Sequence, residues 1–277
     1  MIVIAVGAAL LSVGACTVSP PVSAQTLASD RENLASAVAG LGPLAGVCAA
    51  SPPAGYSAAG LELLAAHGPD WSSALDALEP SAPVAATCDE AALRRDLART
   101  RALAVRLAGA EDDLVTLAIS RAAAADEALT FDSLAGSAPP EVADLANLDP
   151  ALASDLALAE DQAGFVAEYL AAQVPDAAVQ ARLVSSAALH RDRAERLVVM
   201  GRQADPPQAD PRQVAYQLGE PPTDLDSTRA RWATVELALA SHYVALPMSS
   251  GTDLLVTWQL VEAASWGADL PALPFLK

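Results

Sequence analysis

The sequence predicts an all-α protein, and three observations carry that prediction. The composition is 53% hydrophobic, with alanine, the strongest helix former, the most frequent of these residues. Long runs of β-branched residues are scarce, and Asn-Gly or Asp-Gly hairpin turns are almost absent. Apolar residues recur at spacings of three and four along much of the chain, as on one face of a helix. A length of 277 residues suffices for one large core or two modest ones.

The charge balance argues against nucleic-acid binding. The formal net charge is −18, with only 16 lysines and arginines and no basic cluster among them. Such a surface repels phosphate backbones and instead attracts basic proteins, basic peptides or cations. We therefore expect no nucleic-acid partner.

Residues 1–15, "MIVIAVGAALLSVGA", are uncharged and apolar. This run is too short for an ordinary transmembrane helix and suits the apolar region of a signal peptide. The small residues directly before Cys16 resemble the lipobox of bacterial lipoproteins, in which the cysteine is diacylated and becomes the mature N-terminus. The resemblance implies lipidation of Cys16, a tether over residues 16–26 and a place on the extracytoplasmic face of the cell membrane. An ordinary secretory peptide or an uncleaved anchor are the alternatives.

Cys48 and Cys88 are the other two cysteines of the chain. In an oxidising compartment two such thiols usually pair, so export of the chain predicts a disulfide between them. The bond would close a loop of about forty residues and stabilise the fold by about 3 to 4 kcal/mol. The alternative is two buried, unlinked cysteines.

Residues 27–135 are predicted to be an N-terminal helical region. The pattern predicts a helix over 27–39 that ends at the "GLGP" of residues 40–43, two short helices ended by Gly or Pro within 57–80, and an antiparallel hairpin over 89–107 and 111–129. In the hairpin, Gly109 is the expected C-cap, and the expected inward residues are Leu93, Leu97, Leu107, Leu114, Leu117 and Ala128. Residues 136–150 carry three prolines and are predicted to be the linker between two domains.

Residues 151–277 are predicted to form a four-helix bundle. The first helix carries an apolar stripe from Leu152 to Leu170, and the second begins after Asp176 and ends at Gly201. A polar, proline-rich connection of about twenty-five residues follows. The third helix, with Trp232, Val235, Leu239, His242 and Leu246 inward, and the fourth, from about Thr252 to Gly267, complete the bundle. Two antiparallel hairpins joined by one long connection is the ferritin-like topology.

Several motifs of this half resemble a ferritin-like domain of unknown function found in exported actinobacterial proteins. They are "ALAEDQAGFVAEYLAAQ", "AALHRDRAERL", "YQLGEPPTD" and "LVEAASWGADLPALPF", and together they span roughly residues 150–277. The family pattern usually has a histidine where this chain has Asp161. Because that family has no established activity, the resemblance implies a fold and a compartment and little chemistry.

Each bundle helix supplies one candidate metal ligand. Glu160 and His190 are equidistant from the turn near Pro175, and Glu236 and Glu262 are equidistant from the turn near Ser249. In an antiparallel hairpin, equidistant residues lie level, so the sequence predicts two matched pairs. Three carboxylates and an imidazole could hold one divalent ion such as Zn, Mn or Fe.

The competing interpretation is structural. A ferritin-like di-metal centre needs Glu-x-x-His on two helices, but Ala187 stands three before His190, and Ser265 stands three after Glu262. Glu160 and Glu236 lie beside their apolar stripes, where they could reach water. An inward histidine is more often a hydrogen-bonded core residue than a ligand, and Arg193 one turn away can neutralise a carboxylate. We therefore expect no cofactor, with a single metal ion as the alternative.

Other catalytic patterns are missing from the sequence. It contains no Gly-x-Ser-x-Gly, no phosphate-binding glycine loop, no Cys-x-x-Cys and no His-Glu-x-x-His. His67, followed by Gly68, is expected to cap a short helix. The sequence thus favours a non-catalytic binding or scaffolding module, anchored to the membrane by lipid, with an envelope protein or peptide as partner. The alternatives are a metal-binding ferritin-like protein and a small-molecule carrier with an apolar gap between the two halves.

Overall fold

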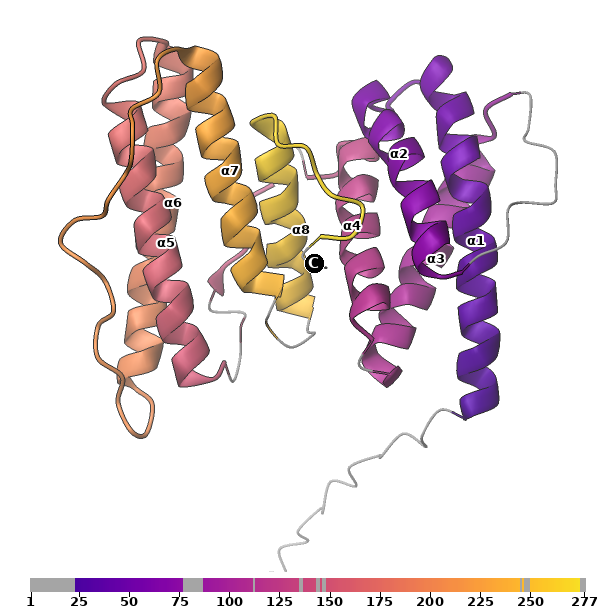
Figure 1. Ribbon diagram of the computed structural model, residues 1–277, viewed down its shortest axis with the longest axis horizontal. Coiled ribbons are helices and arrows are strands. Elements are labelled where there is room, and N and C mark those ends of the chain that lie inside the picture. The colour runs from indigo at the N-terminus through magenta and orange to yellow at the C-terminus, as the bar shows by residue number, and fades with distance from the viewer. Residues whose placement is uncertain are drawn as a thin grey trace, which may run out of the picture.

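The computed structural model describes residues 23–76, 87–111, 113–134, 137–142, 145, 148–244, 246 and 250–274. Within these ranges the chain folds into eight α-helices and contains no strand (Figure 1), which confirms the all-α class. The predicted signal peptide and lipidation site, residues 1–15 and Cys16, lie outside the described residues. The helices are α1 Ala24–Ala50, α2 Ala58–Ala74, α3 Glu90–Glu111, α4 Leu114–Phe131, α5 Pro150–Ala171, α6 Ala177–Arg202, α7 Leu225–Val244 and α8 Ser250–Ser265.

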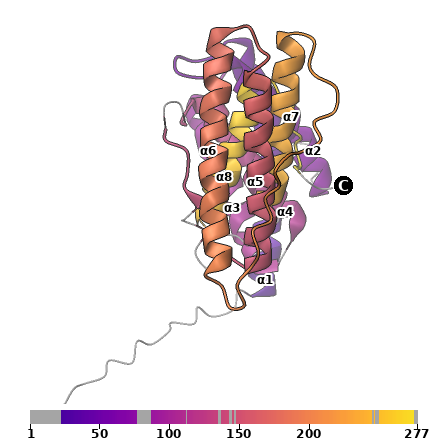
Figure 2. The same cartoon turned by 90° about the vertical axis from the view of Figure 1, so that its left-hand side faces the viewer.

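The helices form two bundles that lie side by side. Helices α1–α4 make the N-terminal bundle and α5–α8 the C-terminal bundle, with α4 and α8 facing each other between them (Figures 1 and 2). Two separate hydrophobic clusters fill the interiors. Each bundle buries its own cluster, so the contact between α4 and α8 joins two cores.

The first two helices are longer than predicted. Helix α1 continues through Pro43 to Ala50, and α2 continues through Pro69, so the predicted ends at the Gly-Pro pairs are wrong. The two pairs lie against each other: a Cβ added at Gly68 would come within 2.6 Å of the Gly42 Cα. A proline inside a helix loses one backbone hydrogen bond, but the close approach of two glycine backbones gives dense packing in return.

A disulfide joins Cys48, near the end of α1, to Cys88, just before α3. The Cα atoms are 4.6 Å apart, and Cys48 is fully buried. The pairing predicted from the sequence is therefore present. It ties the residues just before α3 to the core of the N-terminal bundle.

Among the described residues, one helix is long and apolar enough to cross a membrane, and it is α1. By length and composition it could be a signal segment or a membrane anchor. In the structure, however, Leu34, Val38 and Leu41 of α1 have no exposed surface and pack in the N-terminal cluster. Here α1 is a core helix of the bundle.

Helices α3 and α4 form the predicted hairpin with shifted ends. Helix α3 runs past Gly109 to Glu111, so this glycine is not a cap, and Asp113 caps α4 by accepting a hydrogen bond from the Val115 backbone. Leu93, Leu97 and Leu107 are buried as expected, whereas the Leu114 side chain is exposed. Leu114 is the first residue of α4, where the helix has not yet reached the core.

The C-terminal bundle consists of the hairpins α5/α6 and α7/α8. Asp176 caps α6 as predicted, accepting a hydrogen bond from the Val179 backbone. The connection over residues 203–224 runs the length of the bundle (Figure 2). Its Tyr216 donates a hydrogen bond to buried Asp161 at 2.7 Å and packs edge-on against Phe165. These contacts hold the connection against α5.

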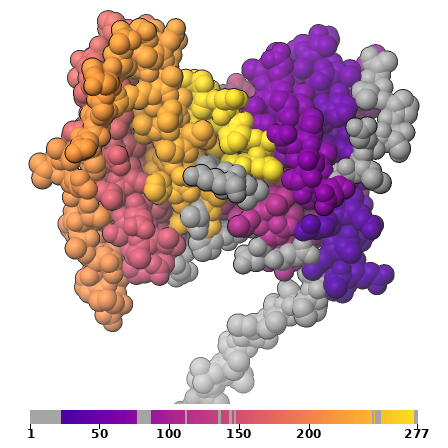
Figure 3. Space-filling model, viewed as in Figure 1, coloured from indigo at the N-terminus to yellow at the C-terminus, as the bar shows by residue number. Residues whose placement is uncertain are grey.

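Two segments outside the helices also complete the cores. Val142 and Leu145, in the stretch predicted to be a linker, are buried in the C-terminal cluster. Ala272, beyond α8, is buried in the N-terminal cluster. Figure 3 shows the last described residues, in yellow, between the two halves of the molecule. The described parts of the linker and of the C-terminal segment are thus packed elements of the fold.

Candidate functional site

Glu160 on α5 and His190 on α6 meet in the middle of the C-terminal bundle. The His190 Nδ1 atom is 2.6 Å from the Glu160 Oε2 atom, and neither side chain is exposed to solvent. The pair is level across the α5/α6 hairpin, as the equal spacing from the turn predicts. The prediction that Glu160 could reach water is wrong, since the whole residue is buried.

Four further side chains surround this pair. Glu236 on α7 approaches the other ring nitrogen, with 3.5 Å between its Oε1 atom and His190 Nε2, and Arg193 Nη1 lies 3.6 Å from the Glu160 Oε1 atom. Tyr243 donates a hydrogen bond to Glu160, and the Gln259 amide donates one to Glu236. We call this set the ionic cluster: Glu160, His190, Arg193, Glu236, Tyr243 and Gln259.

The inward face of helix α7 matches the prediction only in part: Trp232 and Leu239 are buried as predicted. Glu236 and Tyr243 are fully buried, whereas His242, predicted to point inward, is exposed. The buried face of α7 also contains two alanines, Ala233 and Ala240. Because alanine fits a buried or an exposed face equally well, these two residues do not indicate which face of α7 points inward.

Glu262, the fourth candidate ligand, stands apart from the ionic cluster. Its Oε1 atom accepts hydrogen bonds from Arg182 Nη2 at 2.9 Å and from the Trp266 indole at 2.8 Å. Its side chain is 21% exposed. Gln259, about one turn earlier on α8, takes the place opposite Glu236. The structure therefore brings three of the four predicted ligands together.

The electrostatics favour an imidazolium at His190. Burial alone lowers the pKa of His190, but the charges and hydrogen bonds of Glu160 and Glu236 raise this pKa to about 9. Burial raises the pKa of Glu160, yet His190, Arg193 and Tyr243 together bring it below its ordinary value. The ring of His190 therefore carries two protons at neutral pH, next to an ionised Glu160.

Glu236 is the less well compensated acid of the cluster. Burial and the charges of Glu262 and Glu160 outweigh the attraction of His190, so the pKa of Glu236 is raised. Its Oε1 atom and the His190 Nε2 atom both lack a hydrogen-bond partner among the described residues. With both acids ionised, the two carboxylates balance the imidazolium and the guanidinium, which makes the cluster neutral overall.

As metal ligands, the described residues offer little. No group of three or more His, Cys, Asp or Glu side chains is placed to hold a metal ion in this part of the chain. Within the ionic cluster, the Nδ1 atom of His190 is already bonded to Glu160. What the arrangement does is pair charges across three helices and fix their register.

Sequence reasoning missed Tyr243 and Gln259, the two neutral members of the cluster. Gln259 also accepts a long hydrogen bond from Arg193 at 3.5 Å. The sequence offered one signal for Gln259: this polar residue stands three positions before Glu262 and so lies on the same face of the helix. The proposed neutralising role of Arg193 is present in the structure, with Pro140 as a further acceptor for its guanidinium.

A second buried histidine lies between the bundles. His67, expected to cap a helix end, is instead inside α2, and its Nδ1 atom is 2.8 Å from the Asp126 Oδ2 atom on α4. Its Nε2 atom is 2.9 Å from the Leu270 carbonyl oxygen. Nearby, the Trp71 indole donates a hydrogen bond to the Ala272 carbonyl at 2.6 Å. These contacts fasten the C-terminal segment to the N-terminal bundle.

Arg121 on α4 supports the same inter-bundle contact from the other end of α8. Its Nη1 atom donates a hydrogen bond to the Val244 carbonyl at 2.6 Å, and its Nε atom is 3.6 Å from Asp253. The guanidinium is almost fully buried. Charged groups thus occupy both the interior of one bundle and the boundary between the two. No family model, no curated protein and no solved structure matches this chain.

Proposed function

We propose that this protein is a lipid-anchored, extracytoplasmic module that binds or scaffolds a partner at the cell envelope and has no catalytic activity. In this proposal α5–α8 is a ferritin-like bundle in which the ionic cluster occupies the position of a metal centre. The two hairpins and the connection over residues 203–224 support that topology.

The observation that carries the proposal is the surroundings of His190. Both ring nitrogens face carboxylates, and the pKa of about 9 means that the ring keeps its second proton at neutral pH. A metal ion would have to displace that proton and would stand next to the Arg193 guanidinium. The cluster is therefore better suited to stabilising the bundle than to redox chemistry.

The envelope location rests on two further observations. The Cys48–Cys88 disulfide fits an oxidising compartment, and the apolar residues 1–15 with Cys16 have the pattern of an exported lipoprotein. Two hollows that adjoin α8, of about 680 Å³ and about 800 Å³, offer room for a ligand. The larger one lies between the bundles beside Tyr56 and Trp258, where a small-molecule carrier would hold its cargo.

Lipid labelling tests the location directly. Cells expressing the full chain are fed labelled palmitate, and we expect label on the wild-type protein and none on the Cys16→Ala variant. An unlabelled wild-type protein would contradict lipid anchoring. Capture of the anchored wild-type protein from solubilised envelope, with the Cys16→Ala variant as control, then identifies the partner.

A metal-binding function is the second candidate, because one observation favours it. The His190 Nε2 and Glu236 Oε1 atoms face each other at 3.5 Å without hydrogen-bond partners, so a small cation between them would gain two ligands. Elemental analysis of protein purified without a histidine tag decides between the candidates. The binding-module proposal predicts less than about a tenth of an equivalent of Zn, Mn or Fe. A full equivalent that the His190→Gln variant loses would establish the metal site instead.

A further inference from the structure

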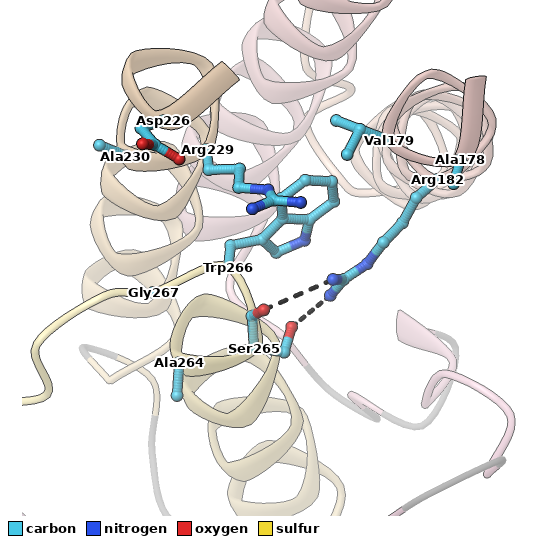
Figure 4. Close-up of a pocket in the computed structure, with 10 residues that line it drawn as sticks. All are labelled: Ala178, Val179, Arg182, Asp226, Arg229, Ala230, Ala264, Ser265, Trp266 and Gly267. Carbon is cyan, nitrogen blue, oxygen red and sulfur yellow. Dashed lines mark hydrogen bonds between the residues drawn. The ribbon is translucent and has the colours of Figure 1, made fainter. Parts of the chain in front are cut away.

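A hollow of about 680 Å³ opens at one end of the C-terminal bundle. Its walls come from the first two turns of α6 and α7, from the end of α8 and from the two residues that follow α8 (Figure 4). Two arginines, Arg182 on α6 and Arg229 on α7, extend toward Trp266 from different helices. Positive groups are scarce in this acidic chain, so two of them in one hollow require an explanation.

Arg229 is the most informative of these residues. Arg229 is exposed, and among the arginines in the described part of the chain it alone has neither a hydrogen bond nor an ion pair, while the others contact carboxylates, carbonyls, amides or hydroxyls. The neighbouring Arg231, for example, donates a hydrogen bond to the Glu220 carbonyl, and Arg182 pairs with Glu262. A guanidinium has five N–H donors in a planar fork that matches an oxyanion. In Arg229 that fork is available to a ligand.

Arg182 is held rigidly beside the same space. Its Nη2 atom donates a hydrogen bond to Glu262 and another to the Ser265 hydroxyl, and its guanidinium carbon lies 3.9 Å from the centre of the Trp266 ring. Its Nη1 atom makes only a 3.5 Å contact with the Ser265 carbonyl. Arg182 therefore keeps donor capacity while its position is fixed, which lowers the entropy cost of binding.

The backbone adds to the positive potential of the hollow. Ala178 and Val179 belong to the first turn of α6, and Asp226 belongs to the first turn of α7. The N-terminus of a helix carries a partial positive charge, and here two long helices begin at one hollow. At α6 the Asp176 carboxylate already accepts the hydrogen bond of the Val179 backbone and offsets this field, so the two guanidinium groups supply the main attraction for an anion.

Besides the Asp176 cap, two acidic groups oppose an anion at this hollow. Glu262 is compensated by Arg182 and by the Trp266 indole. Asp226 lines the hollow and makes no ion pair among the described residues. Removal of the Asp226 charge should therefore strengthen anion binding, whereas removal of the Arg229 charge should weaken it.

We propose that this hollow binds a small soluble oxyanion, a carboxylate or a phosphate, through Arg229 and Arg182, with Trp266 as an apolar wall. This inference rests on the proposed function, because it names the ligand class of the binding module. A free anion is favoured over a lipid head group by the position of the hollow. Helix α1 begins at the lower end of the molecule, whereas α6 and α7 begin at the upper end (Figures 1 and 2). An anchor that precedes α1 would place the hollow away from the membrane.

Titration of the purified full chain with inorganic phosphate and, separately, with succinate tests the proposal. Binding is followed by calorimetry and by the NMR signal of the Trp266 indole, which the Trp266→Phe variant assigns. We expect saturable binding of at least one anion, which Arg229→Gln weakens by about tenfold or more and Asp226→Asn strengthens. Arg95→Gln removes the same charge from a side chain that is 67% exposed on α3, and it should leave the affinity unchanged.

Three outcomes would overturn the inference. They are the absence of saturable binding of either anion, equal affinity in the wild type and the Arg229→Gln variant, and equal loss in the Arg229→Gln and Arg95→Gln variants. Binding to vesicles that contain anionic phospholipid, without binding of the free anions, would assign the hollow to a lipid head group. None of these results bears on palmitate labelling of Cys16, so a failure here is distinguishable from a failure of the proposed function.

Discussion

In the N-terminal bundle, the backbones of α1 and α2 are in close contact at Gly42 and Gly68. The interior of the C-terminal bundle instead contains an ionic cluster without solvent exposure. In the first bundle α1 and α2 are aligned by shape, because only glycine at these two positions allows their backbones to approach so closely. In the second bundle the helices are aligned by charge, because each ion needs its partner at one height. The α1/α2 pair and the ionic cluster thus use different means to fix helix register.

The difference has an energetic consequence. An apolar interior can be repacked at modest cost if its volume is kept, whereas a buried charge that loses its partner is left without compensation. The ionic cluster should therefore be the more sensitive interior. Substitutions in each interior and a change of pH test this difference in sensitivity.

Glu160→Gln should destabilise the C-terminal bundle by about 3 to 5 kcal/mol, because it leaves the His190 imidazolium and Arg193 with one carboxylate fewer. Urea unfolding measures the change. Glu168→Gln, on the same helix, removes an exposed partner of Arg191 and should cost less than about 1 kcal/mol. Equal effects of the two substitutions would show that the ionic cluster does not stabilise the fold.

The Cys48–Cys88 disulfide should stabilise only the N-terminal bundle. Replacement of Cys48 and Cys88 by serine should cost the N-terminal bundle about 3 to 4 kcal/mol, because the unfolded chain regains the freedom of the loop between them. Hydrogen exchange measures the effect helix by helix, and we expect faster exchange in α1 and α2 with little change in α5 and α6. Equal acceleration in both bundles would mean that they unfold as one unit.

The charge-aligned bundle should lose stability in mild alkali. The pKa of His190 is raised from 6.5 to about 9, so the folded state keeps a proton that the unfolded state releases between these values. The stability that this His190 proton contributes is fully present below pH 6.5. It is lost as the pH rises toward about 9, by on the order of 3 kcal/mol. Unfolding curves at successive pH values measure the slope, and His190→Gln should flatten it. An unchanged slope in that variant would assign the loss to other groups.

The shape-aligned bundle should be sensitive to a single methyl group. Gly68→Ala places a Cβ 2.6 Å from the Gly42 Cα and should cost about 1 to 3 kcal/mol, since backbone atoms cannot move aside easily. Gly40→Ala is the matched control, because no atom lies within 4 Å of its added Cβ and alanine favours the helix. Thermal unfolding should show a loss for the first variant and none for the second.

The features that the sequence predicted depend on local pattern or on short separations. The level pairing of Glu160 and His190 followed from equal distances to one tight turn. The Cys48–Cys88 bond followed from pairing the only two cysteines beyond Cys16. Where small residues dominate, as on α7, the inward face was assigned only in part: Trp232 and Leu239 are buried as predicted, but Glu236 was placed beside the apolar stripe rather than within it.

Tertiary contacts explain what the sequence could not predict. Helix α1 continues through Pro43 because α2 packs against it, and no local signal contains that neighbour. The bond between His67 and Asp126 joins residues 59 positions apart in different helices. Glu262 was predicted to lie level with Glu236, but its side chain pairs with Arg182, eighty positions earlier. Such pairings depend on how helices stack, which the periodicity of each helix does not specify.

The C-terminal segment has a consequence for the order in which the protein matures. Ala272 and Leu273 pack in the N-terminal cluster, and the backbone at Leu270 and Ala272 accepts hydrogen bonds from His67 and Trp71. The ribosome makes these residues long after α1–α4 have emerged. During synthesis, His67 and Trp71 therefore lack their hydrogen-bond acceptors until the segment that contains Leu270 and Ala272 has been made. A nascent chain arrested before residue 268 would expose this unfinished surface to proteases and chaperones.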